Sequence, residues 1–195
     1  MHPPAWALAN STRLDFDEFG VAFASAWSQL KSRFLKLECW QRYWEAEGNR
    51  SQTAYDRGDI DTARELLRAE AEVDRPLYQD IRTRGIEYAR VRLVQEPLTP
   101  YLKYELLSYR IRADLGENIE VVRRDDDARL PSEGHFDFLL FDRTTALIHD
   151  YGSAEVGRQT GGWLTRDSNV IARLEQTVAD LRQQAVPLNE YLART

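Results

Sequence analysis

The fold of this chain is decided by residues 85–123, which read GIEYARVRLVQEPLTPYLKYELLSYRIRADLGENIEVVR. Residues 88–94 place two arginines on one side of a predicted β-strand and apolar side chains on the other. Thr99 and Pro100 supply an N-cap and a first-turn proline for a helix that should reach about Ala113. Residues 119–123 predict a second strand. A strand, a helix and a strand in this order predict a parallel pair.

The chain beyond this segment predicts a hairpin and a last helix. Residues 136–141 and 145–151 have the character of two strands, and residues 167–184 show helical spacing. The glycines between the hairpin and the helix are expected to lie in turns, and these are Gly152, Gly157, Gly161 and Gly162. The four predicted strands indicate an α/β fold with a mixed sheet flanked by helices.

Residues 1–84 are expected to form a helical segment that packs on a core of residues 85–195, as one cooperative unit. Residues 1–12 are expected to be a short mobile lead-in. From Phe16 to Leu37, aromatic and apolar side chains recur at steps of three and four, which predicts one helix or two helices joined near Ser32. This stripe should pack in the core, with a cofactor face or a partner groove as the alternative. Helices over residues 61–73 and from Pro76 to about Gly85 follow.

The composition is that of an ordered globular protein. Of 195 residues, 43% are hydrophobic and 30% are charged. The formal net charge of -6 argues against general nucleic-acid binding, which needs many cations to neutralise phosphates. The single cysteine, Cys39, cannot form an intramolecular disulfide, and we find no secretory signal and no run of about 20 apolar residues that could span a bilayer. We therefore expect a cytoplasmic protein without a membrane partner.

The run HFDFLLFD, residues 135–142, resembles the motif of the phospholipase D superfamily, in which His-x-Lys is followed four residues later by Asp. The resemblance implies a nucleophilic histidine and a phosphate-holding lysine, but Asp137 stands where the lysine should be, and we find no second motif copy. Because an aspartate repels a phosphodiester, we expect a degenerate phospholipase D-like core without phosphodiesterase activity. The alternatives are a plain apolar strand, or a metal site built from His135, Asp137, Asp142, His149 and Asp150.

Arg90 and Arg92 are the strongest candidates for binding. Two guanidinium groups at the end of a strand, beside a helix N-terminus, could hold an anion or a carboxylate. We favour the second possibility, in which they pair with Glu87, Glu96 and Glu105 as a structural network, because charge pairs at this spacing usually belong to the scaffold. The candidate ligand-binding residues are Arg90, Arg92, Glu96, Tyr101, Lys103, His135 and Asp137. We predict no catalytic residue, no metal ligand and no cofactor.

In several short segments spread along the chain, the sequence resembles an actinobacterial family of domains of unknown function, DUF6879. The matching segments are Leu37-Glu38 with Tyr43, Gly85, residues 90–98 with Tyr101 and Glu105, Gly116-Glu117-x-Ile119, residues 138–142, and residues 186–191. The resemblance implies a regulatory or sensing accessory, because members are typically encoded near helix-turn-helix regulators. Such a regulator is therefore an expected protein partner, and a small anionic ligand is a second expected partner.

Taken together, these features predict a non-catalytic regulatory protein that binds a ligand or a partner, as an accessory to transcriptional regulation. The alternative is an enzyme or biosynthetic accessory that acts on a phosphate- or carboxylate-bearing substrate. The two differ in geometry, because an enzyme needs its polar groups to converge on one concave pocket. A purely structural role would leave those groups scattered or paired with one another.

Overall fold

The computed structural model describes residues 3–43, 48–124, 130–152 and 157–194. Within these residues the chain alternates strands and helices. The elements are, in chain order, β1 (Ser11–Asp15), α1 (Phe16–Ser28), β2 (Arg33–Glu38), α2 (Arg50–Asp56), α3 (Ile60–Glu72), α4 (Arg75–Arg84), β3 (Glu87–Gln95), α5 (Pro100–Leu115), β4 (Ile119–Arg124), β5 (Phe138–Phe141), β6 (Thr145–Asp150), β7 (Gly161–Thr165), α6 (Ser168–Arg182), β8 (Val186–Pro187) and α7 (Leu188–Arg194).

The strands form one mixed sheet in the order β1-β7-β6-β5-β2-β3-β4-β8. Strands β2, β3 and β4 run parallel, and the other neighbours are antiparallel. The α/β fold with a mixed sheet flanked by helices is therefore confirmed. The four strands expected from the sequence share this sheet, and β3 and β4 are parallel as predicted.

The crossover helix between β3 and β4 begins and ends where its sequence requires. Thr99 adopts extended backbone angles, and its hydroxyl oxygen accepts a hydrogen bond from the amide of Leu102 at 3.0 Å. Pro100 occupies the first helical position, where a missing N–H costs nothing. Gly116 ends α5 with a φ of 110°, a conformation that disfavours side chains other than glycine.

The expectation that the aromatic stripe from Phe16 to Leu37 is helical throughout is wrong. Helix α1 ends at Ser28, and the rest of the stripe lies in strand β2. Strand β2 lies between β3 and β5 and is buried on both faces. Its Phe34 and Leu37 continue the three- and four-residue spacing of the helix before it, so the strand imitates a helix. A distant residue also fixes the turn before β2. The carboxylate of Asp142 accepts hydrogen bonds from the amides of Ser32 at 2.8 Å and Arg33 at 3.0 Å.

The end of the expected lead-in and two of the four glycines expected in turns form part of the sheet, whereas Gly152 lies in a turn as predicted. Strand β1 pairs with β7, and Ala7 before it is fully buried in the core. Gly161 and Gly162 belong to β7 and not to a turn. A Cβ atom on Gly162 would lie 2.3 Å from the carbonyl oxygen of Ile148 and 2.6 Å from the Phe19 ring. Glycine is therefore needed where α1 packs closely on the strand. Because β1 and β2 lie within residues 1–84, that segment is not purely helical.

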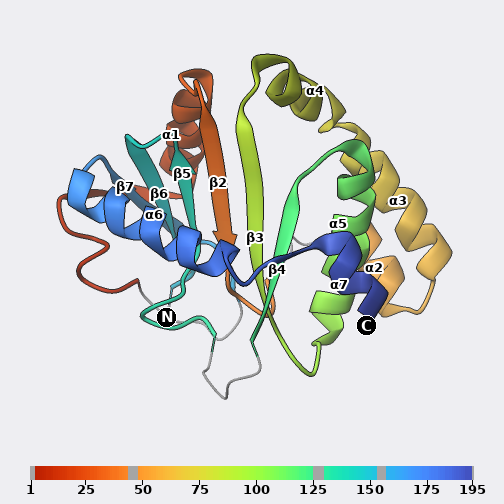
Figure 1. The fold of residues 1–195 in the computed structure, drawn as a ribbon. Helices are drawn as coiled ribbons and strands as arrows, with labels where there is room; N and C mark the ends of the chain where they lie inside the picture. Colours follow the sequence, from red (N-terminus) through yellow and green to blue (C-terminus); the bar gives the residue numbers. More distant parts are fainter. Residues whose placement is uncertain (1–2, 44–47, 125–129, 153–156, 195) are drawn as a thin grey trace.

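Helices cover the two faces of the sheet unequally. Helix α6 lies in front of the strands in Figure 1 and buries one face, while α1 lies behind them. On that second face α1 and α4 pack over one group of strands, and α5 and α7 pack over β4 and β8. The strip over β2 and β3 lies between these two groups of helices, so the middle of the second face holds the polar residues described below.

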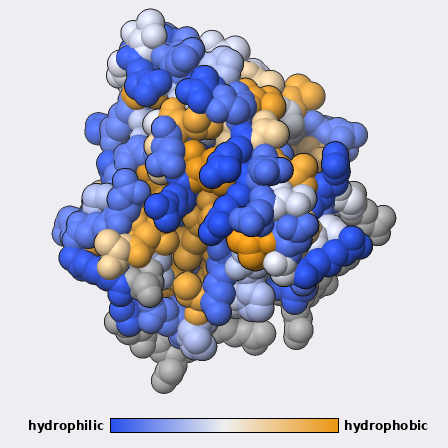
Figure 2. Space-filling view, turned by 90° about the vertical axis from the view of Figure 1, so that its right-hand side faces the viewer, coloured by the Kyte–Doolittle hydropathy of each residue, from blue (hydrophilic) through white to orange (hydrophobic). Residues whose placement is uncertain are grey.

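The side of the molecule that carries α3 and α5 is at the right of Figure 1 and faces the viewer in Figure 2, where apolar side chains form a band between hydrophilic ones. A groove of about 500 Å³ between these two helices is lined by Leu107, Ile111 and Leu115 and by charged side chains. Among the described residues, no helix combines the length and the apolar character that a membrane crossing requires.

Candidate functional site

Charged side chains gather on the face of β2 and β3 that α6 does not cover. In the parallel register, Lys36 lies beside Arg90 and Glu38 lies beside Arg92. Since side chains alternate along a strand, these four residues point to the same face of the sheet. Arg92 is fully buried and Glu38 is 5% exposed. Buried charges are costly unless they are paired and hydrogen-bonded, so their partners decide what this site can do.

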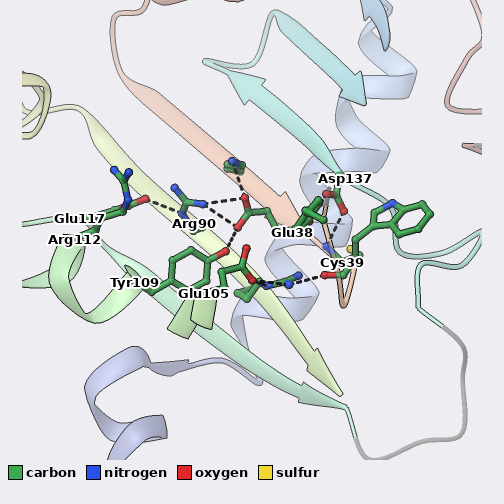
Figure 3. Close-up of polar contacts among 12 residues, drawn as sticks. Glu38, Cys39, Arg90, Glu105, Tyr109, Arg112, Glu117 and Asp137 are labelled. Atoms are coloured by element: carbon green, nitrogen blue, oxygen red, sulfur yellow. Dashed lines mark hydrogen bonds and ion pairs between the residues drawn. The ribbon is translucent and has the colours of Figure 1, made fainter. Parts of the chain in front are cut away.

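Arg90 is held between two carboxylates. Its Nη1 atom donates to both carboxylate oxygens of Glu38 at 2.9 Å, and its Nε atom donates to Glu117 at 2.7 Å. Figure 3 shows this chain of contacts and the hydroxyl of Tyr109, which also donates to Glu38. The Arg90 guanidinium lies 4.9 Å from the centre of the Tyr109 ring, a cation–π distance. These contacts satisfy Arg90 without any added ligand.

Arg92 joins the sheet to α5. Its Nε and Nη2 atoms donate to the same oxygen of Glu105, at 3.0 and 2.7 Å, and Nη2 also donates to the carbonyl of Trp40. The guanidinium lies 5.4 Å from the centre of the Tyr43 ring. Burial raises the pKa of Glu105 and the charge of Arg92 opposes this effect, so the ion pair compensates only part of the cost of burying the carboxylate.

Asp137 forms a second buried cluster at the end of β2. Its carboxylate accepts hydrogen bonds from the Cys39 amide at 2.7 Å, from the Tyr151 hydroxyl at 2.8 Å and from the Tyr43 hydroxyl. Burial raises the pKa of Asp137, while the hydrogen bond from Tyr43 acts in the opposite direction. Burial and the neighbouring Asp137 charge also raise the pKa of the Cys39 thiol, which disfavours the reactive thiolate.

Electrostatics keep the remaining carboxylates ionised. Burial alone would raise the pKa of Glu38, but the charges of Arg90 and Lys36 outweigh burial and hold this pKa well below its usual value. The pKa of Glu117 is lowered in the same way, because Arg90 and two tyrosine hydroxyls stabilise its charged form against burial. The hydroxyls belong to Tyr78 at 2.9 Å and Tyr88 at 3.0 Å. The network is therefore one of compensated charges.

A cavity of about 250 Å³ lies beside this network, between α1 and α4 over β2 and β3. We call it the α1–α4 cavity. Its lining is aromatic and charged and consists of Phe19, Phe23, Trp27, Phe34, Lys36, Asp74, Leu77, Tyr78, Tyr88, Arg90, Arg112, Leu139 and His149. A concave site with aromatic walls and a few converging polar groups is the usual form of a small-molecule site.

His149 lies in the wall of the α1–α4 cavity in an unusual state. Its ring stacks on Tyr151 with centres 5.7 Å apart and lies 4.8 Å from the Phe19 ring. Neither ring nitrogen has a geometrically acceptable hydrogen bond with the described residues. Burial, followed by the charge of Lys36, lowers the pKa of His149 to about 3, against smaller opposing effects of the Glu38 charge and of Gln159. The imidazole is therefore neutral at physiological pH.

The structure brings together only some of the residues that the sequence singled out. Arg90, Arg92 and Asp137 belong to the buried clusters, and Tyr101 packs against Tyr43 with ring centres 5.8 Å apart. The other candidates lie elsewhere. Glu96 pairs with Arg123 at 2.9 Å, Lys103 is exposed on α5, and the backbone of His135 is tied to Ser132. Arg92 pairs with Glu105 as the structural-network alternative proposed, whereas Arg90 pairs with Glu38 and Glu117.

The end of β3, where the anion site was expected, is occupied by Gln41. The Gln41 side chain donates to the carbonyl of Leu93 at 3.0 Å and accepts from the amide of Gln95 at 2.8 Å. Its backbone carbonyl accepts a hydrogen bond from the Thr99 hydroxyl at 2.7 Å. Gln41 therefore links the end of β3 to the start of α5.

The residues of the phospholipase D-like motif do not meet in one place. His135 precedes β5, while Asp142 follows it at the opposite end and binds the turn before β2. Asp150 pairs with Arg13. In the described part of the chain no group of three or more histidine, cysteine, aspartate or glutamate side chains could hold a metal ion. The structure therefore does not gather these residues as the metal-site alternative requires.

Sequence reasoning missed several members of the network, namely Lys36, Glu38, Tyr43, Tyr109 and Glu117. Lys36 and Glu38 alternate with Leu35 and Leu37, which is the pattern of a strand. This signal was overlooked because the segment was expected to be helical. Glu117 follows the end of α5, and nothing in its local sequence indicates a contact with Arg90, which lies 27 residues earlier.

Comparison with known families supports a relationship over almost the whole chain. A family model described as a domain of unknown function, DUF6879, matches residues 21–193. No curated protein matches the sequence. The matched range contains every residue of the buried network and of the α1–α4 cavity except Phe19.

Proposed function

This chain belongs to the DUF6879 family, and on that premise we propose that it is a non-catalytic binding domain with a regulatory role. One observation carries the proposal. The charged groups on the central strands are paired with one another, so that Lys36, Arg90, Arg92 and Arg112 each have a carboxylate partner. Enzymes keep reactive groups available to a substrate, whereas these groups stabilise one another.

The state of the nucleophilic and basic groups supports the same proposal. Cys39 is fully buried, and its raised pKa keeps it as a thiol. His149 has a pKa of about 3 and is a weak base near neutral pH. Asp137, at the position of the motif lysine, accepts three hydrogen bonds and cannot stabilise negative charge on a phosphoryl group.

The finer parts of the proposal rest on the sequence alone. They are a cytoplasmic location, an actinobacterial origin, descent from a phospholipase D-like scaffold and a helix-turn-helix regulator as the protein partner. In this proposal, binding of a small ligand or of the regulator by the domain changes transcription. The α1–α4 cavity gives the domain a place for a ligand.

The same cavity also favours the second candidate, an enzyme or biosynthetic accessory for a phosphate- or carboxylate-bearing substrate. Lys36, Arg90 and Arg112 all line it and would attract such a group. Against catalysis, Arg90 and Arg112 already have carboxylate partners, and the neighbouring imidazole is a weak base.

The proposal is tested by two measurements on the full chain. The purified protein should not hydrolyse bis(4-nitrophenyl) phosphate faster than its His135→Ala variant does. Turnover that the His135→Ala substitution abolishes would overturn the non-catalytic proposal. Second, the protein should form a complex with the helix-turn-helix regulator encoded beside it, and the complex should change the affinity of that regulator for its operator DNA. A regulator that neither binds the chain nor changes in DNA affinity contradicts the regulatory role.

A further inference from the structure

We propose that the α1–α4 cavity binds a small molecule made of one aromatic ring and one carboxylate group. This inference deepens the proposed function and rests on it in one respect, namely that the ligand is bound and not converted. Four properties of the cavity identify the ligand: its aromatic walls, the charges in its lining, the state of His149 and its volume.

The walls favour an aromatic ligand. Phe23 and Trp27 of α1 stack with ring centres 5.8 Å apart, and Trp27 meets Phe34 edge to face at 5.1 Å. Phe34 contacts Tyr88 at 5.3 Å, which extends the aromatic surface across β2 and β3. An added ring gains from edge-to-face and offset contacts with such walls beyond the burial of its apolar area. The α1 stripe therefore serves both as packing for the sheet and as a ligand wall.

The charges in the lining favour an anionic ligand. Lys36, Arg90 and Arg112 line the cavity, whereas Asp74 is the one carboxylate among the lining residues. Arg112 pairs with Asp74, and Arg90 is held by carboxylates behind the lining. A ligand carrying a positive charge would meet more cations than anions on entry. The sign of the lining therefore favours an anionic ligand over an ammonium ligand, although aromatic walls alone would suit an ammonium group.

Lys36 is the cation best placed to bind a carboxylate. Its side chain is 25% exposed, and its ammonium group lies 2.6 Å from Glu38. Glu38 is also bound by Arg90 and by the Tyr109 hydroxyl, so it remains compensated when Lys36 turns toward a ligand. An ammonium group has three donors, and one of them can serve the ligand while another keeps the contact with Glu38.

His149 supplies the polar group that completes the site. Its ring nitrogens are buried and have no acceptable hydrogen bond with described residues, which costs about 1–3 kcal/mol for each unsatisfied group. A neutral imidazole offers one N–H donor. Because both ring nitrogens are closed to solvent, a ligand carboxylate reaches this donor when the His149 ring turns toward the cavity that it lines together with Lys36.

The size of the cavity suits a ligand with one ring. A volume of about 250 Å³ lies below the range of roughly 300–1,000 Å³ that drug-sized ligands occupy. A benzoate-like or phenylacetate-like acid fits in this space. The ligand class is therefore a monocyclic aromatic acid.

Binding is tested by titrating the full chain with benzoate, followed by ¹H–¹⁵N NMR and calorimetry. Three probes serve as controls: benzamide has the same ring and no charge, benzylamine has the opposite charge, and acetate has no ring. We expect benzoate to bind at least tenfold more tightly than each control and to shift the resonances of Lys36 and His149. Equal binding of benzoate and benzamide, or tighter binding of benzylamine, overturns the ligand class.

Lys36→Met should weaken benzoate binding about tenfold, as expected for the loss of one charged hydrogen bond. Lys36→Arg, which keeps the charge, should retain binding, and Lys31→Met provides a matched control on an exposed lysine that does not line the cavity. Melting curves of each variant confirm folding. An equal effect of Lys36→Met and Lys31→Met, or no binding of benzoate by the folded wild type, overturns the inference. Either result leaves the regulator complex intact, whereas chemical conversion of the probe contradicts the proposed function itself.

Discussion

The guanidinium of Arg92 donates two hydrogen bonds to a single carboxylate oxygen of Glu105, at 3.0 and 2.7 Å, and the Arg92 side chain is fully buried. Arg92 lies on β3 and Glu105 on α5, the helix that leads from β3 to β4. The pair therefore binds the crossover helix to the middle of the sheet. Its neighbours, Glu38 and Arg90, continue the same polar layer toward the α1–α4 cavity.

Substitution of Arg92 should destabilise the fold strongly. Arg92→Ala leaves the buried Glu105 carboxylate without its partner, and breaking a buried pair in this way costs about 3–5 kcal/mol of unfolding free energy. Urea unfolding followed by circular dichroism measures this change. Arg64→Ala is the matched control, because Arg64 pairs with Asp61 on the surface and should cost less than about 1 kcal/mol. Similar losses of unfolding free energy in the two variants would show that the buried pair contributes no more to stability than the surface pair.

Gly162 of β7 and the exposed Gly20 of α1 should respond oppositely to alanine. Gly162→Ala places a Cβ atom 2.3 Å from the Ile148 carbonyl oxygen, so we expect a loss of at least about 1–3 kcal/mol from overpacking. Gly20 lies within α1, and a Cβ atom there meets nothing within 4 Å. Gly20→Ala should therefore stabilise the protein by up to about 1 kcal/mol through helix propensity. Thermal melting of both variants measures these changes in stability. A Gly162→Ala variant as stable as the wild type would disprove the close packing.

His149 should make the protein less stable in mild acid. Its pKa is lowered from 6.5 in an ordinary environment to about 3 by burial and by Lys36. Below about pH 6.5 the unfolded chain binds a proton at this position and the folded chain does not, so acid favours unfolding. This contribution to stability is complete above that pH and is lost progressively as the pH falls toward about 3.

The His149 effect is measured by urea unfolding of the wild type and of His149→Phe from pH 7 to pH 4. The pH dependence of the wild type should be steeper, by up to about 1.4 kcal/mol per pH unit below pH 6.5. Glu105 and Asp137 have raised pKa values and act in the opposite direction, but they are present in both proteins and cancel in the difference. Parallel pH profiles would show that His149 is protonated as easily in the folded chain as in the unfolded chain.

Cys39 should be unreactive in the folded protein. It is fully buried, and its pKa is raised by burial and by the charge of Asp137. A thiol-specific reagent such as 5,5′-dithiobis(2-nitrobenzoic acid) should label the native chain far more slowly than the urea-unfolded chain, in which one thiol becomes available. Similar rates in the two states would contradict the buried position. Asp137→Asn offers a further comparison, since it removes the charge without exposing the thiol.

The sequence correctly predicted elements whose signals are local. Caps and terminal glycines set the limits of α5 and α4, and alternation identified β3. The predictions went wrong where the signal depends on distant partners. In β2, Phe34 and Leu37 continue the helical spacing of the preceding segment, and the turn before the strand is held by Asp142, more than a hundred residues later. Strand β7 contains two glycines that local rules assign to a turn.

By itself, the sequence determined the α/β class, the crossover unit of β3, α5 and β4, and the candidacy of Arg90 and Arg92. Only the tertiary structure decided how these arginines are used. Their partners Glu38, Glu105 and Glu117 come from β2, from α5 and from the turn after α5, and the α1–α4 cavity is lined by seven elements, α1, β2, α4, β3, α5, β5 and β6. The physical reason is that Coulomb energy and desolvation depend on distances through space and on burial, which the folded chain fixes and residue spacing does not.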